Sequence, residues 1–142
     1  YERVIHGHLG GRPVAADPDV GAAVVAFVAE LARSGDLPVL HDVSDGGMAV
    51  AVAEICIASG VGASVEVDDW RSLFSEAPHR VLVAAEPETV PPILGAAEHA
   101  GVPMTRVGVI EGSTISLSGT ATQVGLDEAS TTYFRALRRR ME

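Results

Sequence analysis

A short acidic segment rich in glycine contains the residues of this chain that are best suited to chemistry. It is the run His41–Gly47, HDVSDGG, which lies between a short apolar segment and a long one. Such a pattern predicts a strand, a loop and a helix, and the first backbone N–H groups of a helix have no partners within it. The paired glycines allow an anion or another backbone segment to approach those groups closely. The loop is therefore a candidate phosphate-binding loop.

The charge of the loop restricts the kind of ligand. Asp42 and Asp45 would repel a free phosphate, whereas a nucleotide that carries its own Mg²⁺ would be tolerated. Five residues of the loop are candidate ligand-binding residues: Asp42, Ser44, Asp45, Gly46 and Gly47.

Helix capping explains the same residues equally well. Ser and Asp just before a helix accept hydrogen bonds from its first free amides, and a carboxylate there complements the positive end of the helix dipole. Residue types alone support ligand binding and capping to the same degree, so both interpretations stay open.

Arg80 is the sixth candidate binding residue. It lies between a polar loop and an apolar segment, where its guanidinium could bind a phosphate or a carboxylate through two nitrogens. A structural ion pair with Glu76 or with a neighbouring domain is the alternative, and in isolation it is the better supported of the two.

Other arrangements of reactive side chains are weaker. The spacing suggests no Ser-His-Asp or Cys-His set and contains no P-loop or dinucleotide fingerprint, so no catalytic residue is assigned. His6 and His8 would share one face of a strand, but two ligands without a third make a poor metal site. No residue is assigned as a metal ligand.

Composition limits the class of protein. The chain has 142 residues, of which 47% are hydrophobic and 20% charged, enough for one domain with a substantial core. Its net charge of −9 argues against a nucleic-acid partner. The longest apolar run, Val20–Ala29, is shorter than the roughly 20 residues that cross a bilayer, which argues against a membrane. With Cys56 as its single cysteine, the chain can form no internal disulfide, and a cytoplasmic location is expected.

Periodicity and capping residues predict an α+β fold, a mixed β-sheet with packed helices. Residues 1–16 are expected to be a linker or strand that joins an upstream domain, and residues 17–142 a single domain. The strand at 80–85 is apolar enough to lie in the middle of a sheet. Helices are expected at 17–34, 48–58, 91–99 and from Asp127 onward, and strands at 37–40, 62–67, 80–85, 105–110, 114–118 and 121–126, the last two as a hairpin.

The heptapeptide resembles the motif of the C-terminal domain in the aminoimidazole ribonucleotide (AIR) synthetase superfamily. Its His41 and its Ser-Asp-Gly-Gly point to the synthetase subunits of the phosphoribosylformylglycinamidine synthases. Val4–Gly11, Leu73–Val81 and Gly101–Ile110 resemble further segments of that family, in the same order. Ala77 and His79 depart from the family, which usually has Ser and a small residue there.

This resemblance implies the domain fold of the superfamily and a place in purine biosynthesis. Enzymes of this family convert formylglycinamide ribonucleotide to formylglycinamidine ribonucleotide with ATP, Mg²⁺ and ammonia derived from glutamine. The implied partners are upstream ATP-binding domains of the same polypeptide, a glutaminase subunit and a small accessory subunit. The six candidate residues would be pseudo-symmetric counterparts of active-site residues, with a structural and auxiliary nucleotide-site role. The chain alone is expected to be inactive.

Two alternatives remain open. The chain could be the C-terminal domain of another ATP-dependent enzyme of the AIR synthetase superfamily, in which the glycine loop takes part directly in nucleotide chemistry. It could also be a non-enzymatic oligomerisation or ligand-sensing module, with the apolar helix at its interface.

Overall fold

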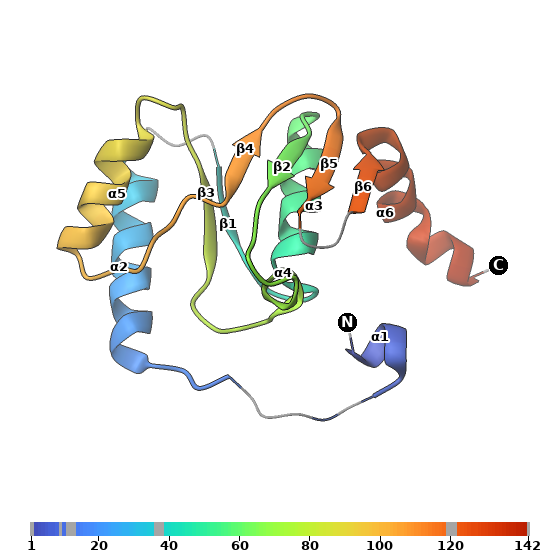
Figure 1. Ribbon diagram of the computed structural model, residues 1–142, viewed down its shortest axis with the longest axis horizontal. Helices are drawn as coiled ribbons and strands as arrows, with labels where there is room; N and C mark the ends of the chain where they lie inside the picture. The colour runs from blue at the N-terminus through green and yellow to red at the C-terminus, as the bar shows by residue number, and fades with distance from the viewer. Residues whose placement is uncertain (1, 9, 11–13, 36–38, 119–121, 142) are drawn as a thin grey trace.

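A computed structural model describes residues 2–8, 10, 14–35, 39–118 and 122–141 (Figure 1). Two β-sheets and their helices follow one another across the molecule. The helices α2 and α5 lie at one end, followed by the pair β1–β3, then by α3 with the second sheet, and finally by α6 at the other end. This mixed arrangement confirms the predicted α+β fold.

The first sheet contains β1 (Val39–Asp42) and β3 (Val81–Ala84), which pair antiparallel with His41 opposite Leu82. The expectation that the 80–85 strand lies in mid-sheet is wrong for the described residues, because β3 pairs with β1 alone. Its apolar run has another cause. Leu82 packs toward the core around α3, whereas Ala85, just after the strand, packs toward the core between α2 and α5. A strand between two apolar layers has the same composition as a strand with two strand neighbours.

The second sheet has the order β4-β2-β5-β6. Its strand β2 (Ala63–Val65) pairs antiparallel with β4 (Gly108–Ile110) and parallel with β5 (Thr114–Leu117). The predicted hairpin is confirmed, since β5 pairs antiparallel with β6 (Thr122–Gly125). Its expected turn at residues 119 and 120 lies outside the described residues.

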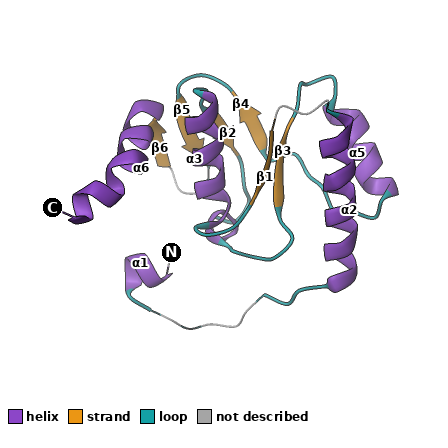
Figure 2. Ribbon diagram, turned by 180° about the vertical axis from the view of Figure 1, so that it is seen from behind, coloured by secondary structure: helices purple, strands orange, loops and turns teal. Residues whose placement is uncertain are grey.

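The helices α2 (Pro18–Ser34) and α5 (Val90–His99) lie side by side (Figures 1 and 2). Asp17 caps α2 by accepting a hydrogen bond of 3.0 Å from the Asp19 amide, as the sequence predicts. Four buried residues form a core beside these helices: Phe27, Ile93, Ala97 and Val102.

The main core surrounds α3 (Gly47–Ser59). This helix contacts both sheets as well as α4 (Arg71–Phe74) and α6 (Leu126–Met141). Cys56 is fully buried in it, and this burial raises the pKa of the Cys56 thiol. The prediction that α3 is covered on several sides and that Cys56 is a core residue is confirmed.

Two short helices were not expected from the sequence. Glu2–His6 form α1, so the strand considered for this segment, with His6 and His8 on one face, is absent. The helix α4 has four residues, too few for a periodic pattern. It begins where Asp69 accepts a hydrogen bond from the Arg71 amide at 3.0 Å. The division of the chain at residue 16 stays a prediction.

No helix in the part of the chain that the structure describes is both long and apolar enough to cross a membrane.

Leu73 provides a test of the main core. Its side chain is fully buried, so Leu73→Ala should lower the free energy of unfolding by about 2–5 kcal/mol, measured by urea denaturation. Val25, which is 65% exposed, is the control, and Val25→Ala should change that free energy by less than about 0.5 kcal/mol. Equal losses for both variants would contradict the placement of α4 in the core.

Candidate functional site

The acidic glycine loop connects β1 to α3. Gly46 is the N-cap residue of α3, and both Gly46 and Gly47 have left-handed backbone conformations, with φ of 84° and 71°. Gly46 has no side chain with which to cap α3, and capping by Ser44 or Asp45 is not observed. Instead the Gly47 amide donates to the backbone carbonyl of Ser44 at 3.0 Å, which makes the loop a tight turn.

Glu76 supplies the hydrogen bond that the loop side chains do not. Its Oε1 accepts from the Gly46 amide at 2.9 Å, across a sequence separation of 30 residues. A carboxylate near the start of a helix is favoured by the helix dipole. From the sequence, Glu76 is expected only as a partner of Arg80. Nothing in the local sequence indicates its contact with Gly46, because the contact depends on how α4 packs.

Gly47 is in close contact with the backbone of α4. A Cβ atom at Gly47 would lie 2.6 Å from the Leu73 carbonyl oxygen and 2.8 Å from the Phe74 Cα. Real side chains do not tolerate such distances from backbone atoms. The close approach that the paired glycines allow is therefore used by this chain's own backbone.

Arg80 makes further contacts with the same segment. Its Nη1 donates to the carbonyl oxygens of Ser72 at 3.1 Å and Ser75 at 3.0 Å, and Nη2 lies 3.8 Å from the Met48 sulfur. The structural alternative is thus observed with different partners, since the guanidinium binds backbone carbonyls rather than Glu76.

Asp42 and Ser44 form a local pair on the exposed side of the loop. The Ser44 hydroxyl donates to Oδ2 of Asp42. This hydrogen bond is the main reason why the pKa of the Asp42 carboxyl is lowered, with smaller contributions from a backbone hydrogen bond and from the charge of His41. Asp42 is therefore ionised over most of the accessible pH range.

A groove of about 730 Å³ opens beside the loop. One wall is the apolar face of α2, including Val24 and Val28, and the other consists of residues 42–45 and 76–81. His79, one of the departures from the family pattern, has a left-handed φ of 62°. Its ring lies against Gly21 of α2, where a Cβ would be 2.6 Å from the His79 Nε2.

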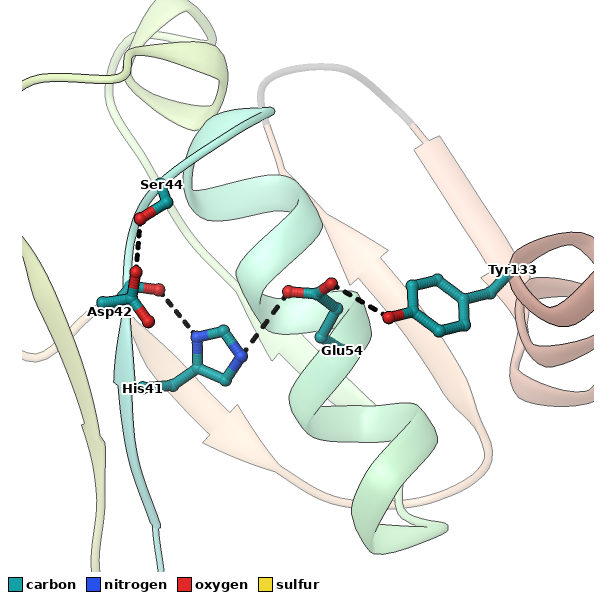
Figure 3. A network of polar contacts seen from close by, with 5 residues as sticks. All are labelled: His41, Asp42, Ser44, Glu54 and Tyr133. Carbon is teal, nitrogen blue, oxygen red and sulfur yellow. Dashed lines mark hydrogen bonds and ion pairs between the residues drawn. The ribbon is translucent and has the colours of Figure 1, made fainter. Parts of the chain in front are cut away.

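A second polar cluster escaped the sequence analysis. Figure 3 shows His41, Glu54 and Tyr133 meeting between β1, α3 and α6. His41 Nε2 lies 3.5 Å from Glu54 Oε2, and the Tyr133 hydroxyl donates to Glu54 Oε1 at 3.3 Å. Glu54 is recognisable from the sequence as the single charge of α3, but the sequence does not indicate its contacts with His41 and Tyr133.

Residues 1–119 match the family described as AIR synthase related protein, C-terminal domain. The chain belongs to this family. The match covers the glycine loop, Glu76 and Arg80, and it confirms the resemblance that the heptapeptide suggested.

Curated relatives are much longer than this chain. It is 38% identical over 128 residues to phosphoribosylformylglycinamidine synthase subunit PurL of Thermobifida fusca, and 43% identical over 125 residues to that of Methylocella silvestris. These alignments cover 89% and 85% of this chain but 17% of each relative. The similarity therefore concerns one part of those proteins.

Solved structures agree on the fold. The chain superposes on PurLQS from Thermotoga maritima with a TM-score of 0.71 at 20% identity, covering 82% of this chain and 22% of that one. It superposes on T. maritima PurL complexed with ATP with a TM-score of 0.70 at 19% identity, covering 82% and 23%. The domain fold of the AIR synthase related family is thus shared.

In this family member, the structure brings five candidate residues together between the end of β1 and the start of α3, and Arg80 lies near them through its contact with Met48. Asp42, Ser44 and Asp45 are exposed, whereas Gly47 is buried. No group of three His, Cys, Asp or Glu residues that could hold a metal occurs among the described residues. The ligand-binding role of the six residues stays a prediction.

Gly47→Ala tests the contact with α4, with Gly60→Ala as a matched control. Both glycines have φ near 70°, but a Cβ at Gly60 would meet no atom within 4 Å. Gly60→Ala should therefore cost about 1–2 kcal/mol for its backbone conformation alone. Gly47→Ala should cost a further 1–3 kcal/mol or so, because the methyl group overlaps the α4 backbone. Urea denaturation of both variants measures the difference, and equal costs would contradict the close approach.

Ser44→Ala tests the Asp42–Ser44 pair. The pKa of Asp42 should rise toward its ordinary value of 3.8, as followed by carboxyl ¹³C NMR, whereas Ser44→Thr keeps the hydroxyl and should keep the pKa low. Because the folded-state pKa of Asp42 is lowered, the ionised group stabilises the fold above pH 3.8 and loses this effect as the pH falls through the folded-state pKa. An unchanged pKa in Ser44→Ala would show that the hydroxyl is not the cause.

Proposed function

We propose that this chain serves as the C-terminal domain of a PurL-type subunit of phosphoribosylformylglycinamidine synthase. That enzyme would convert formylglycinamide ribonucleotide to formylglycinamidine ribonucleotide with ATP and glutamine-derived ammonia in purine biosynthesis. The family match over residues 1–119 and the identity of 38% and 43% to two PurL subunits support this assignment. Structures of T. maritima PurL complexed with ATP and with FGAR (formylglycinamide ribonucleotide) are known.

Within that enzyme, the domain has a structural role and does no chemistry alone. This proposal rests on one observation. Several of the groups best suited to chemistry make contacts within the domain. Gly46 is hydrogen-bonded to Glu76, Gly47 is packed against the α4 backbone, and Arg80 donates to two backbone carbonyls. These contacts join α3 to the segment 71–80 and so form one side of the domain.

ATP and Mg²⁺ belong to the full-length enzyme in this proposal. As the loop stands, it does not fit a phosphate at the start of α3, because Glu76 occupies the Gly46 amide and the α4 backbone covers Gly47. No catalytic step is therefore assigned to the loop. A nucleotide-contacting role for it in the intact subunit would require Glu76 to leave Gly46.

The proposed partners are the ATP-binding domains of the same polypeptide, together with a glutaminase subunit and a small accessory subunit, in the cytoplasm. The groove between α2 and the loops 42–45 and 76–81 combines an apolar wall with exposed carboxylates. Such a composition is suited to the mixed polar and apolar surface of an interdomain contact.

Reconstitution in trans tests the proposed function. The parent subunit, a truncated subunit that lacks this domain, and this chain would each be assayed for amidation of formylglycinamide ribonucleotide with ATP and ammonia. We expect full activity of the parent, little activity of the truncated subunit, none of the chain alone, and recovery when the chain is added to the truncated subunit.

Leu73→Ala supplies the matched control, because a chain with a damaged core should restore less activity than the unaltered chain. Amidation by the chain alone would contradict the structural role. A parent subunit that has no such activity would contradict the family function itself.

A further inference from the structure

Two polar contacts of Glu54 connect three parts of the chain that are distant in sequence. Figure 3 shows the Glu54 carboxylate of α3 between His41 of β1 and Tyr133 of α6. Its Oε2 lies 3.5 Å from His41 Nε2, and its Oε1 accepts from the Tyr133 hydroxyl at 3.3 Å. His41 Nδ1 lies 2.6 Å from the backbone carbonyl oxygen of Asp42. Each ring nitrogen of His41 thus faces an oxygen.

The protonation of His41 decides whether both of its contacts are favourable. A carbonyl oxygen only accepts hydrogen bonds, and so does an ionised carboxylate. A neutral imidazole has one N–H group, so either tautomer would direct a nitrogen lone pair at an oxygen. Only the imidazolium donates to both the Asp42 carbonyl and the Glu54 carboxylate.

Among the described side chains of α6, burial is confined to the start of the helix. Leu126 and Ala129 at its start pack against the main core. The side chains of residues 131–136 are exposed, and Tyr133 itself is 51% exposed. The hydroxyl of Tyr133 therefore adds a contact to α3 beyond the point where burial anchors the helix.

We propose that His41 and Glu54 form a proton-dependent latch that holds α6 through Tyr133. When His41 is charged, it fixes the Glu54 carboxylate in the position that accepts from Tyr133. When His41 is neutral, its lone pair repels that carboxylate or the Asp42 carbonyl. The hydrogen bond from the Tyr133 hydroxyl to Glu54 then weakens. A lower pH therefore strengthens the attachment of α6.

The surroundings of His41 leave it as the group that controls the latch. The groove of about 680 Å³ beside it contains His41, Glu54 and Tyr133 as its titratable lining residues. On β3, the residue opposite His41 is the apolar Leu82, and the adjacent charge on β1 is Asp42. Carboxyl groups ordinarily titrate below about pH 5 and phenols near pH 10, whereas imidazole changes charge between about pH 5 and 8.

Amide hydrogen exchange of the 142-residue chain at pH 5.5 and pH 8.0 tests the latch. After correction for intrinsic exchange rates, we expect amides of residues 131–136 to be about two- to five-fold better protected at pH 5.5, the range of a partly exposed ion pair. In His41→Gln and Glu54→Gln this difference should vanish. His99→Gln is the matched control and should keep it, because His99 Nδ1 contacts the Gly95 carbonyl in its own helix.

A second readout does not depend on the stability of the variants. The ring signals of Tyr133 in the unaltered chain should shift with pH at the same midpoint as those of His41, as followed by ¹H–¹³C NMR. Tyr133→Phe removes the hydroxyl at an exposed position and should abolish the pH dependence of α6 protection. Equal protection at both pH values in the unaltered chain, or a pH dependence that survives in His41→Gln, would overturn the proposal. Neither result would bear on the proposed function.

Discussion

The close packing of the start of α3 against the backbone of α4 is the constraint on which the rest of this domain depends. At Gly47 the two backbones approach to distances that exclude any side chain. Two sets of hydrogen bonds support the contact, from the Gly46 amide to Glu76 and from Arg80 to the carbonyls of Ser72 and Ser75. Because α3 borders both sheets, the position of its first turn sets the position of the main core.

This constraint also explains why a loop with the appearance of a binding site makes internal contacts here. An anion at the start of a helix would bind to free amides, but the protein supplies its own anion in Glu76 and its own backbone at Gly47. The negative charge of the loop is moderated locally in the same way, since Asp42 accepts from the Ser44 hydroxyl. A carboxylate that already has hydrogen-bond donors is more stable in its ionised form than a free one. The acidic loop is thus compatible with a well-packed domain of the AIR synthase related family.

The helix α3 differs in burial and charge between its first residues and Glu54. At its start Gly47 and Met48 are buried and the backbone makes polar contacts, whereas Glu54, its only charged side chain, lies partly exposed in the groove beside α6. At about one-third exposure, this carboxylate lies within reach of both His41 and Tyr133. The contact between α3 and α6 is therefore anchored by apolar burial at the start of α6 and by a polar contact further along it.

Features that depend on neighbouring residues could be predicted from the sequence. Asp17-Pro18 and Ser34-Gly35 bounded α2, the alternation at 114–118 located β5, and the heptapeptide pointed to the family. The partners of these groups follow from the packing of the elements. Among the described residues β3 pairs with β1 and with no other strand, and Glu76 reaches Gly46. Arg80 binds backbone carbonyls, and Glu54 contacts both His41 and Tyr133. The physical reason is that periodicity records which face of an element is apolar, and capping residues act within one turn. Which groups then meet across 30 or 79 residues depends on how those faces pack in space.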